Sequence, residues 1–199
     1  MTPTGTPTPA LAIAPVFHSA WRDYPWGIQG QLSHNHPGQP LAPAQAEQVS
    51  RQFFGAYSTA ACSSRETVFL WREATREIYV LFGGSTGLQP DLCPDFWEVY
   101  PDLWQPGWSN NEDLQAPPGL VVPVMGFGTV WRDLFYGRSE GGLGFALGPE
   151  QYATATVQRF ENATALYFPD TAEVYVLFPH FRYTTRSGEL AGRVWFRNP

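Results

Sequence analysis

The sequence predicts an α+β fold in which two tandem repeats, each made of short helices followed by a β-hairpin, pack as one globule. The chain has 199 residues, enough for a sizeable core. Aromatic residues make up 16% of it, charged residues only 15%, and Gly and Pro contribute 19 residues each. This composition favours strands joined by tight turns over long helices.

An internal repeat is the second observation behind this fold class. Several short segments of the first half return in the same order in the second half. Ordered matches of this kind indicate a tandem duplication. The main matches are "FHSAWRD" (17–23) with "FGTVWRD" (127–133), "VSRQF" (49–53) with "VQRF" (157–160), and "TREIYVLF" (75–82) with "TAEVYVLF" (171–178).

Each repeat contains a pair of apolar runs that predicts a β-hairpin. The runs are rich in β-branched and aromatic residues, are of strand length, and are separated by four or five turn-type residues. They are "TVFLW" (67–71) with "IYVLF" (78–82), and "TALYF" (164–168) with "VYVLF" (174–178).

The segments before the hairpins predict helices. "APAQAEQVSRQF" (42–53) and "GPEQYATATVQRF" (148–160) are rich in helix formers, with a proline near the start of each, where a missing N–H is harmless. A further short helix is predicted at each "WRD", since Val130, Leu134 and Phe135 have helical spacing. These helices, added to the hairpins, give the α+β prediction.

Composition shifts divide the chain into four parts. Residues 1–16 form a Thr/Pro-rich tether, residues 17–104 the first repeat with an aromatic loop, residues 105–126 a connection, and residues 127–199 the second repeat. The tether has neither the basic start nor the apolar run of a targeting signal. We therefore expect it to be the end of a semi-rigid linker in a longer surface protein.

The charge of the chain narrows the classes of partner. The formal net charge is -6, and all 12 basic residues are Arg. Nucleic acid is a poor partner for such a surface, and lysine-based Schiff-base or P-loop chemistry is excluded. No apolar run reaches transmembrane length, so we expect no direct membrane insertion. We also predict no cofactor.

Two cysteines, Cys62 and Cys93, are a candidate disulfide if the protein is extracellular. The alternative is a pair of unpaired buried thiols.

Longer motifs of the second half resemble a known repeat. "PPGLVVPVMGFGTVWRD", "GGLGFALGPEQYATATVQRFENATALYF" and "EVYVLF" are similar to a repeat of secreted and surface proteins of filamentous bacteria, and to the short LGFP repeat of bacterial cell-wall proteins. The chain departs from the pattern at "FENA", which has Ala163 in place of glycine, and at "FFGA" and "LSHN" in the first half. The resemblance implies a non-catalytic module of the cell surface that binds wall polymer or glycan.

An aromatic stretch provides the predicted ligand site. "CPDFWEVYPDLWQPGW" (93–108) places several aromatic residues beside acidic ones in a loop-rich segment. Exposed aromatic rings near carboxylates are a common way to hold sugar rings. The alternative is a structural cap over the hairpin. The predicted ligand-binding residues are Trp97, Tyr100, Trp104, Trp108, Asp95 and Asp102.

Three weaker candidates come from other motifs. The "WRD" segments (21–23 and 131–133) offer an aromatic face with an Arg/Asp pair, although a framework role is favoured because the motif repeats. His34 and His36, with Glu47 nearby, form a weak candidate metal site, against the alternative of a polar loop. Paired acids for hydrolysis would be Asp95 with Glu98, or Asp133 with Glu140.

Together these observations predict a non-catalytic binding or adhesion module at the cell surface of a bacterium, with cell-wall or extracellular glycan as its ligand. We expect it to be monomeric within a larger protein. One alternative is a glycan hydrolase that uses paired carboxylates, and another is a purely structural spacer.

Overall fold

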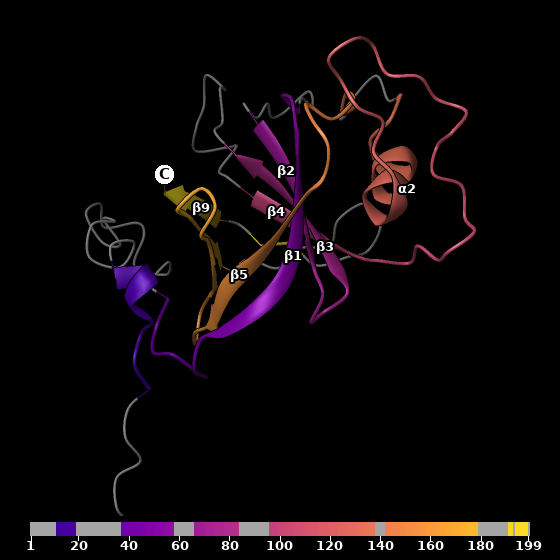
Figure 1. Ribbon diagram of the computed structural model, residues 1–199. Helices are drawn as coiled ribbons and strands as arrows, with labels where there is room; N and C mark the ends of the chain where they lie inside the picture. The colour runs from indigo at the N-terminus through magenta and orange to yellow at the C-terminus, as the bar shows by residue number, and fades with distance from the viewer. Residues whose placement is uncertain are drawn as a thin grey trace, which may run out of the picture.

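The computed structural model describes residues 11–18, 37–57, 66–83, 96–137, 142–178, 191–192 and 194–198. In this part of the chain nine strands accompany one α-helix and one short 3-10 helix (Figure 1). The elements in chain order are η1 (Pro15–Phe17), β1 (Gln45–Phe54), β2 (Glu66–Arg72), β3 (Glu77–Gly83), β4 (Phe96–Pro101), α2 (Met125–Leu134), β5 (Gln151–Arg159), β6 (Thr164–Phe168), β7 (Glu173–Phe178), β8 (Ala191–Gly192) and β9 (Val194–Asn198).

All strands belong to one antiparallel sheet in the order β8-β4-β3-β2-β1-β5-β6-β7-β9. The strands β1 to β7 form a curled half-barrel, with the long β1 and β5 side by side at its centre (Figure 1). β8 and β9 are separated by one residue, yet β8 pairs with β4 and β9 with β7. The curl of the sheet therefore brings β4 and β7 close enough for both to pair with one short C-terminal segment.

The α+β prediction is wrong, because the segments expected to be helices before the hairpins are strands. β1 takes up most of the first segment and ends one residue beyond it, and β5 lies within the second. The two strands pair with each other from Gln45–Val157 to Arg51–Gln151. Ala, Gln and Glu favour helices locally, but the alternation in "YATATV" has the two-residue period of a strand. Pairing in the sheet outweighs the weak local propensity.

Both predicted hairpins are present and share one register. Leu70 pairs with Tyr79 in β2–β3, and Leu166 pairs with Tyr175 in β6–β7. The turns also match, since Arg76 and Ala172 hold the equivalent positions with φ of 54° and 57°. The helix predicted at the second "WRD" is present as α2. The apolar run "LVVPVM" (120–125) before it forms only a single bridge, between Val121 and Ala146.

In each half, the segment that precedes the first strand pairs with the end of the other half's first strand. Pro40 forms a β-bridge with Phe160, the residue that follows β5. Ala146 forms the equivalent β-bridge with Phe54, the last residue of β1. Next to these bridges, the Leu41 N–H donates to Arg159 O over 2.9 Å, and the Leu147 N–H donates to Phe53 O over 2.8 Å. The halves are thus related by an approximate two-fold axis. The tandem duplication and its boundaries stay a prediction.

Three apolar clusters fill the space around the sheet. The inner face carries one cluster shared by both halves, to which Val49, Leu70 and Leu166 belong. On the outer face, α2 covers β1 to β4, and the N-terminal segment around η1 covers β6 and β7. Figure 1 accordingly shows α2 and η1 on well-separated parts of the molecule. If the two repeats begin at "FHSAWRD" and "FGTVWRD", the start of each repeat packs over strands of the other repeat.

α2 forms because its apolar residues recur on one face. Phe127, Val130 and Trp131 are buried, with Leu134 partly buried behind them. Trp131 is 0% exposed, and its Nε1 donates to Gly144 O over 2.9 Å. The opposite face of α2 is free to line a surface site. No helix within the described ranges is long and apolar enough to cross a membrane.

Candidate functional site

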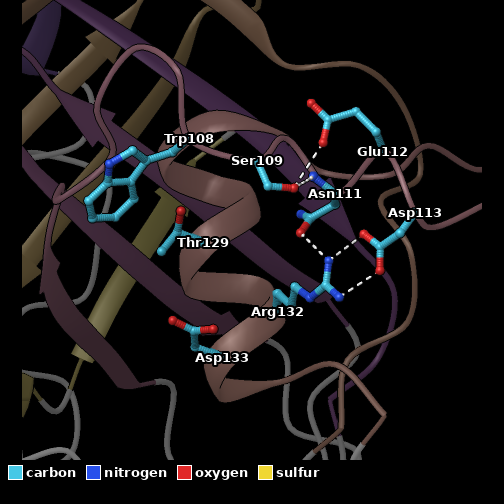
Figure 2. A pocket seen from close by; sticks show the side chains of 8 residues that line it. All are labelled: Trp108, Ser109, Asn111, Glu112, Asp113, Thr129, Arg132 and Asp133. Carbon is cyan, nitrogen blue, oxygen red and sulfur yellow. Dashed lines mark hydrogen bonds and ion pairs between the residues drawn. The ribbon is translucent and has the colours of Figure 1, made fainter.

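An open depression of about 710 Å³ lies between the outer face of α2 and the loop before it. Figure 2 shows Trp108 and Thr129 toward one end of this depression and the Arg132–Asp113 pair toward the other. Thr129, Arg132 and Asp133 share one face of α2 because they are three or four residues apart. The lining residues are Trp108, Ser109, Asn111, Glu112, Asp113, Thr129, Arg132 and Asp133.

Asn111 fastens the loop to the helix. Its side chain is buried, and Nδ2 donates to Pro123 O over 2.9 Å and to Gly128 O over 3.3 Å. Its backbone has φ of 62°, a left-handed conformation that Asn tolerates better than most residues. Gly128 leaves the room for this contact, since a Cβ there would lie 2.6 Å from Pro123 O and 2.8 Å from Asn111 Nδ2.

Arg132 is held in place from two sides. Its guanidinium donates to both oxygens of Asp113, over 2.6 and 2.7 Å, and to Asn111 Oδ1 over 3.1 Å (Figure 2). The hydrogen bond from Arg132 lowers the pKa of the Asp113 carboxyl, and the same bond raises the pKa of Arg132. The pair is exposed, so it contributes little to stability, but its bidentate geometry fixes a planar polar group in the depression.

Glu112 closes the turn beside this pair. The Ser109 hydroxyl donates to Glu112 Oε2 over 2.8 Å, and the Asn110 N–H donates to the same oxygen over 2.9 Å. Hydrogen bonds from backbone N–H groups, those of Glu112 itself and of Asn110, and from the Ser109 hydroxyl lower the pKa of Glu112. Because Asp113 is shifted in the same direction, both carboxyls are anionic at neutral pH.

Trp108 supplies the aromatic surface of the site. It is 49% exposed, whereas most large apolar residues of the sheet are buried. An exposed indole face that shares a depression with an Arg–Asp pair and a hydroxyl offers stacking and hydrogen-bonding groups suited to a sugar ligand. A general acid needs a raised pKa. The pKa values of Glu112 and Asp113 are lowered, so these two carboxyls are not suited to that role.

The other predicted aromatic residues do not gather around Trp108. Trp97 is 8% exposed in the inner cluster, and Tyr100 is 5% exposed in the outer cluster, so the two project from opposite faces of β4. The Tyr100 hydroxyl hydrogen-bonds to Glu98. Trp104 is half-buried, and its Nε1 has no hydrogen-bond partner within the described structure. None of these residues lines the depression.

Asp102 has a structural environment. It accepts hydrogen bonds from Trp71 Nε1 over 3.0 Å and from the Trp104 N–H over 3.3 Å. A Cβ at Gly126 would lie 2.5 Å from its Oδ1, so Asp102 packs against the start of α2. This carboxylate joins β2, the loop and the helix.

Several predicted residues lie outside the described part of the chain. The "WRD" at 21–23 is among them. In the "WRD" at 131–133 the tryptophan is part of the core and the arginine pairs with Asp113. Elsewhere within the described ranges, no group of three or more His, Cys, Asp or Glu is arranged to hold a metal. The residues outside are His34, His36, Cys62, Cys93, Asp95 and Glu140.

The sequence interpretation named Arg132 and Asp133 within "WRD", but it missed the loop residues that complete the site around Trp108. "NNEDLQ" (110–115) has the composition of a plain loop, and nothing local shows that Asn111 is buried or that Asp113 meets Arg132. Two consecutive asparagines before two acids were the available signal, because Asn often marks left-handed turn positions.

Comparison of the chain with protein-family models, with curated proteins and with solved structures finds no match.

Proposed function

We propose that this protein is a non-catalytic extracellular binding or adhesion module whose ligand is a cell-wall or extracellular glycan, and that the depression beside Trp108 is its binding site. The observation that carries the proposal is the half-exposed indole at the edge of a depression lined by fixed polar groups. Sugar rings have apolar faces that stack on indole, and hydroxyl edges that hydrogen-bond to Arg and Asp.

The proposal includes a location at the cell surface, behind the Thr/Pro-rich residues 1–16. It is supported by the sequence composition and the resemblance of the second half to surface repeats. The open form of the site also suits one segment of a long polymer, because such a chain must enter and leave the site at both ends.

Glycan binding tests the proposal directly. A glycan array and isothermal titration with the hits should show binding by the native protein. Trp108→Ala should abolish it, while Trp108→Phe should retain part of it because an aromatic face remains. The matched control is Tyr152→Ala, which removes another exposed aromatic ring, 68% exposed on β5, that does not line the depression.

Two results would count against the proposal. If no glycan binds, the module has another function, and the structural spacer becomes the better interpretation. If glycans bind equally well to Trp108→Ala and to the native protein, the site lies elsewhere. Release of shorter glycans by the purified native protein would favour the hydrolase instead.

A further inference from the structure

Each half of the chain needs the other half to bury its apolar surface. The first half ends with β4, and the second begins with α2. Phe127 and Trp131 of α2 share the outer cluster with Phe69 of β2. In return, Phe17 of the N-terminal segment shares a cluster with Phe178 of β7. A half on its own would expose these surfaces to water, so each half needs a complementary half.

Buried polar contacts also join the halves. Arg51 of β1 is 1% exposed, and its guanidinium donates to Asp170 Oδ2 over 2.8 Å and to Glu173 Oε2 over 2.7 Å in the β6–β7 hairpin. The Gln39 N–H donates to Glu161 Oε2 over 3.0 Å just after β5. An apolar core combined with specific polar contacts is typical of a stable interface between two chains. The surface between the halves therefore has the properties of a subunit interface.

A tight, exposed turn is the hinge between the halves. The Trp108 N–H donates to Gln105 O over 3.1 Å, and Gly107 closes the turn with φ of 94°. Gln105, Pro106 and Gly107 are all exposed, and a Cβ at Gly107 would meet no atom within 4 Å. Opening the turn therefore costs little beyond the Trp108–Gln105 hydrogen bond.

The chain is fastened on both sides of this hinge. Before it, Asp102 accepts a hydrogen bond from Trp71 Nε1 over 3.0 Å, within the first half. After it, Asn110 Oδ1 accepts from the Met125 N–H over 3.1 Å, within the second half. The residues that line the depression, all between 108 and 133, lie on the same side of the hinge as α2. The depression therefore stays with the second half when the hinge opens.

We propose that two copies of this chain exchange halves through the hinge and form a domain-swapped dimer. The first half of each copy pairs with the second half of the other, so β1 of one copy lies beside β5 of the other. The contacts between halves are the same in both arrangements, and only the hinge differs. A short turn favours the exchange because it restricts how the halves of one chain meet. This inference goes beyond the proposed function and does not depend on it.

Refolding at two chain concentrations tests the exchange in the native protein. A short connection gives the two halves of one chain an effective concentration on the order of 1 mM. Refolding from urea at about 1 mM chain should therefore yield similar amounts of monomer and dimer. At about 10 µM it should yield almost only the monomer that the sequence predicts. Size-exclusion chromatography with light scattering measures both species.

Hinge variants test where the exchange occurs. Deletion of Pro106 and Gly107 removes the turn, so the halves of one chain no longer meet and the variant should be dimeric even at about 10 µM. The matched control is deletion of Pro117 and Pro118, two exposed residues within the second half, which should leave the protein monomeric. Insertion of a flexible Gly/Ser segment after Pro106 should suppress the dimer of the native chain.

Cysteines placed across the β1–β5 pairing identify the exchanged halves. Gln48 lies opposite Thr154, and its Nε2 donates to the Thr154 hydroxyl over 2.8 Å. One copy carries Gln48→Cys and the other Thr154→Cys, both in a chain with Cys62→Ser and Cys93→Ser. The two copies are refolded together at about 1 mM and oxidised. Domain swapping brings the two new cysteines together, so the disulfide-linked dimer should contain one chain of each kind.

Each experiment has a result that would overturn the proposal. The first is a native chain that refolds only to monomer at the higher concentration, and the second is a hinge deletion that folds as a monomer. The third is a dimer of the mixed copies without the disulfide, while a single chain carrying both Gln48→Cys and Thr154→Cys forms the bond internally. If the hinge deletion does not fold, the native chain and the mixed copies decide between exchange and no exchange. Glycan binding by the native monomer is measured separately, so the proposed function stands or falls by itself.

Discussion

Gln52 and Gln158 hold equivalent places in the two halves of the sheet, and each donates its side-chain amide to the segment that precedes the other half's first strand. Gln52 Nε2 donates to Gly148 O over 3.0 Å, and Gln158 Nε2 donates to Ala42 O over 3.2 Å. Both side chains are almost fully buried. The pair lies on either side of the approximate two-fold axis, which passes near the pairing of Gln48 with Thr154.

The two glutamines differ in what else they hold. Gln158 also donates to Ala12 O over 2.9 Å and accepts from the Ala14 N–H over 2.9 Å, which fastens the N-terminal segment to the sheet. Gln52 Oε1 has no hydrogen-bond partner within the described ranges. The symmetry of the backbone is therefore not matched by equal numbers of side-chain hydrogen bonds.

This difference predicts unequal effects of the same substitution. Gln158→Ala leaves several buried backbone groups unpaired and should lower the free energy of unfolding by about 2–4 kcal/mol. Gln52→Ala loses one hydrogen bond but also removes a buried carbonyl oxygen that has no partner within the described ranges. It should therefore lower the free energy of unfolding by only about 1 kcal/mol. Urea denaturation of both variants measures the difference. Equal losses would show that the N-terminal segment contributes nothing through Gln158.

Asn111 is expected to stabilise the fold as well as the site. Asn111→Ala removes the hydrogen bonds to Pro123 O and Gly128 O. It also leaves an alanine at φ of 62°, where its Cβ is strained and no side-chain hydrogen bond offsets the strain. Asn111→Gly removes the same bonds without the left-handed strain, so it should be about 1 kcal/mol more stable than Asn111→Ala. Thermal or urea unfolding of both variants checks the order. The reverse order would mean that the strain is relieved by movement of the loop.

Gly128 is predicted to tolerate no side chain. A methyl group there would meet Pro123 O and the Asn111 amide well inside contact distance, and the backbone oxygen cannot move away easily. Gly128→Ala should therefore cost about 1–3 kcal/mol in the free energy of unfolding, although alanine favours helices. The matched control is Gly144→Ala, where nothing lies within 4 Å of the new Cβ and the change should be near neutral. A stable Gly128→Ala variant would contradict the described packing of loop on helix.

The sequence predicts some parts of this fold better than others, for physical reasons. The hairpins β2–β3 and β6–β7 follow from local patterns, since "IYVLF" and "VYVLF" need only a turn and a partner run nearby. The strands β1 and β5 depend on each other across the whole chain, and their Ala, Gln and Glu content favours the wrong local structure. Local propensity depends only on neighbouring residues, so it does not indicate a pairing between strands as far apart in the sequence as β1 and β5.

The candidate site shows the same limit. Trp108 could be nominated from the sequence because aromatic residues in loops are often exposed, but Trp97 and Tyr100 in the same stretch became core. Which of them is buried depends on the alternation along β4, and that strand was not part of the prediction. The contact of Asp113 with Arg132 depends on how the loop folds back on α2, which no spacing in the sequence reports.

Tyr79 gives a prediction about alkaline stability. Its side chain is 8% exposed, its hydroxyl donates to Glu77 Oε2 over 2.6 Å, and the Arg72 guanidinium lies 5.8 Å from the ring centre. Burial, and then the hydrogen bond to Glu77, raise the pKa of Tyr79 from 10.0 to about 12. The folded protein therefore holds this proton at a pH where the unfolded chain releases it.

The sign of the effect follows from that difference. The contribution of Tyr79 to stability is fully present below pH 10 and is lost as the pH rises from about 10 toward 12, by roughly 2–3 kcal/mol over the whole window. Tyr79→Phe has no proton to lose, so its urea midpoint should fall less steeply between pH 9 and about 11.5 than that of the native protein. The tyrosinate absorbance of the native protein, compared with that of Tyr79→Phe, should show one late-titrating group. Parallel slopes for the two proteins would mean that Tyr79 ionises at the same pH folded and unfolded.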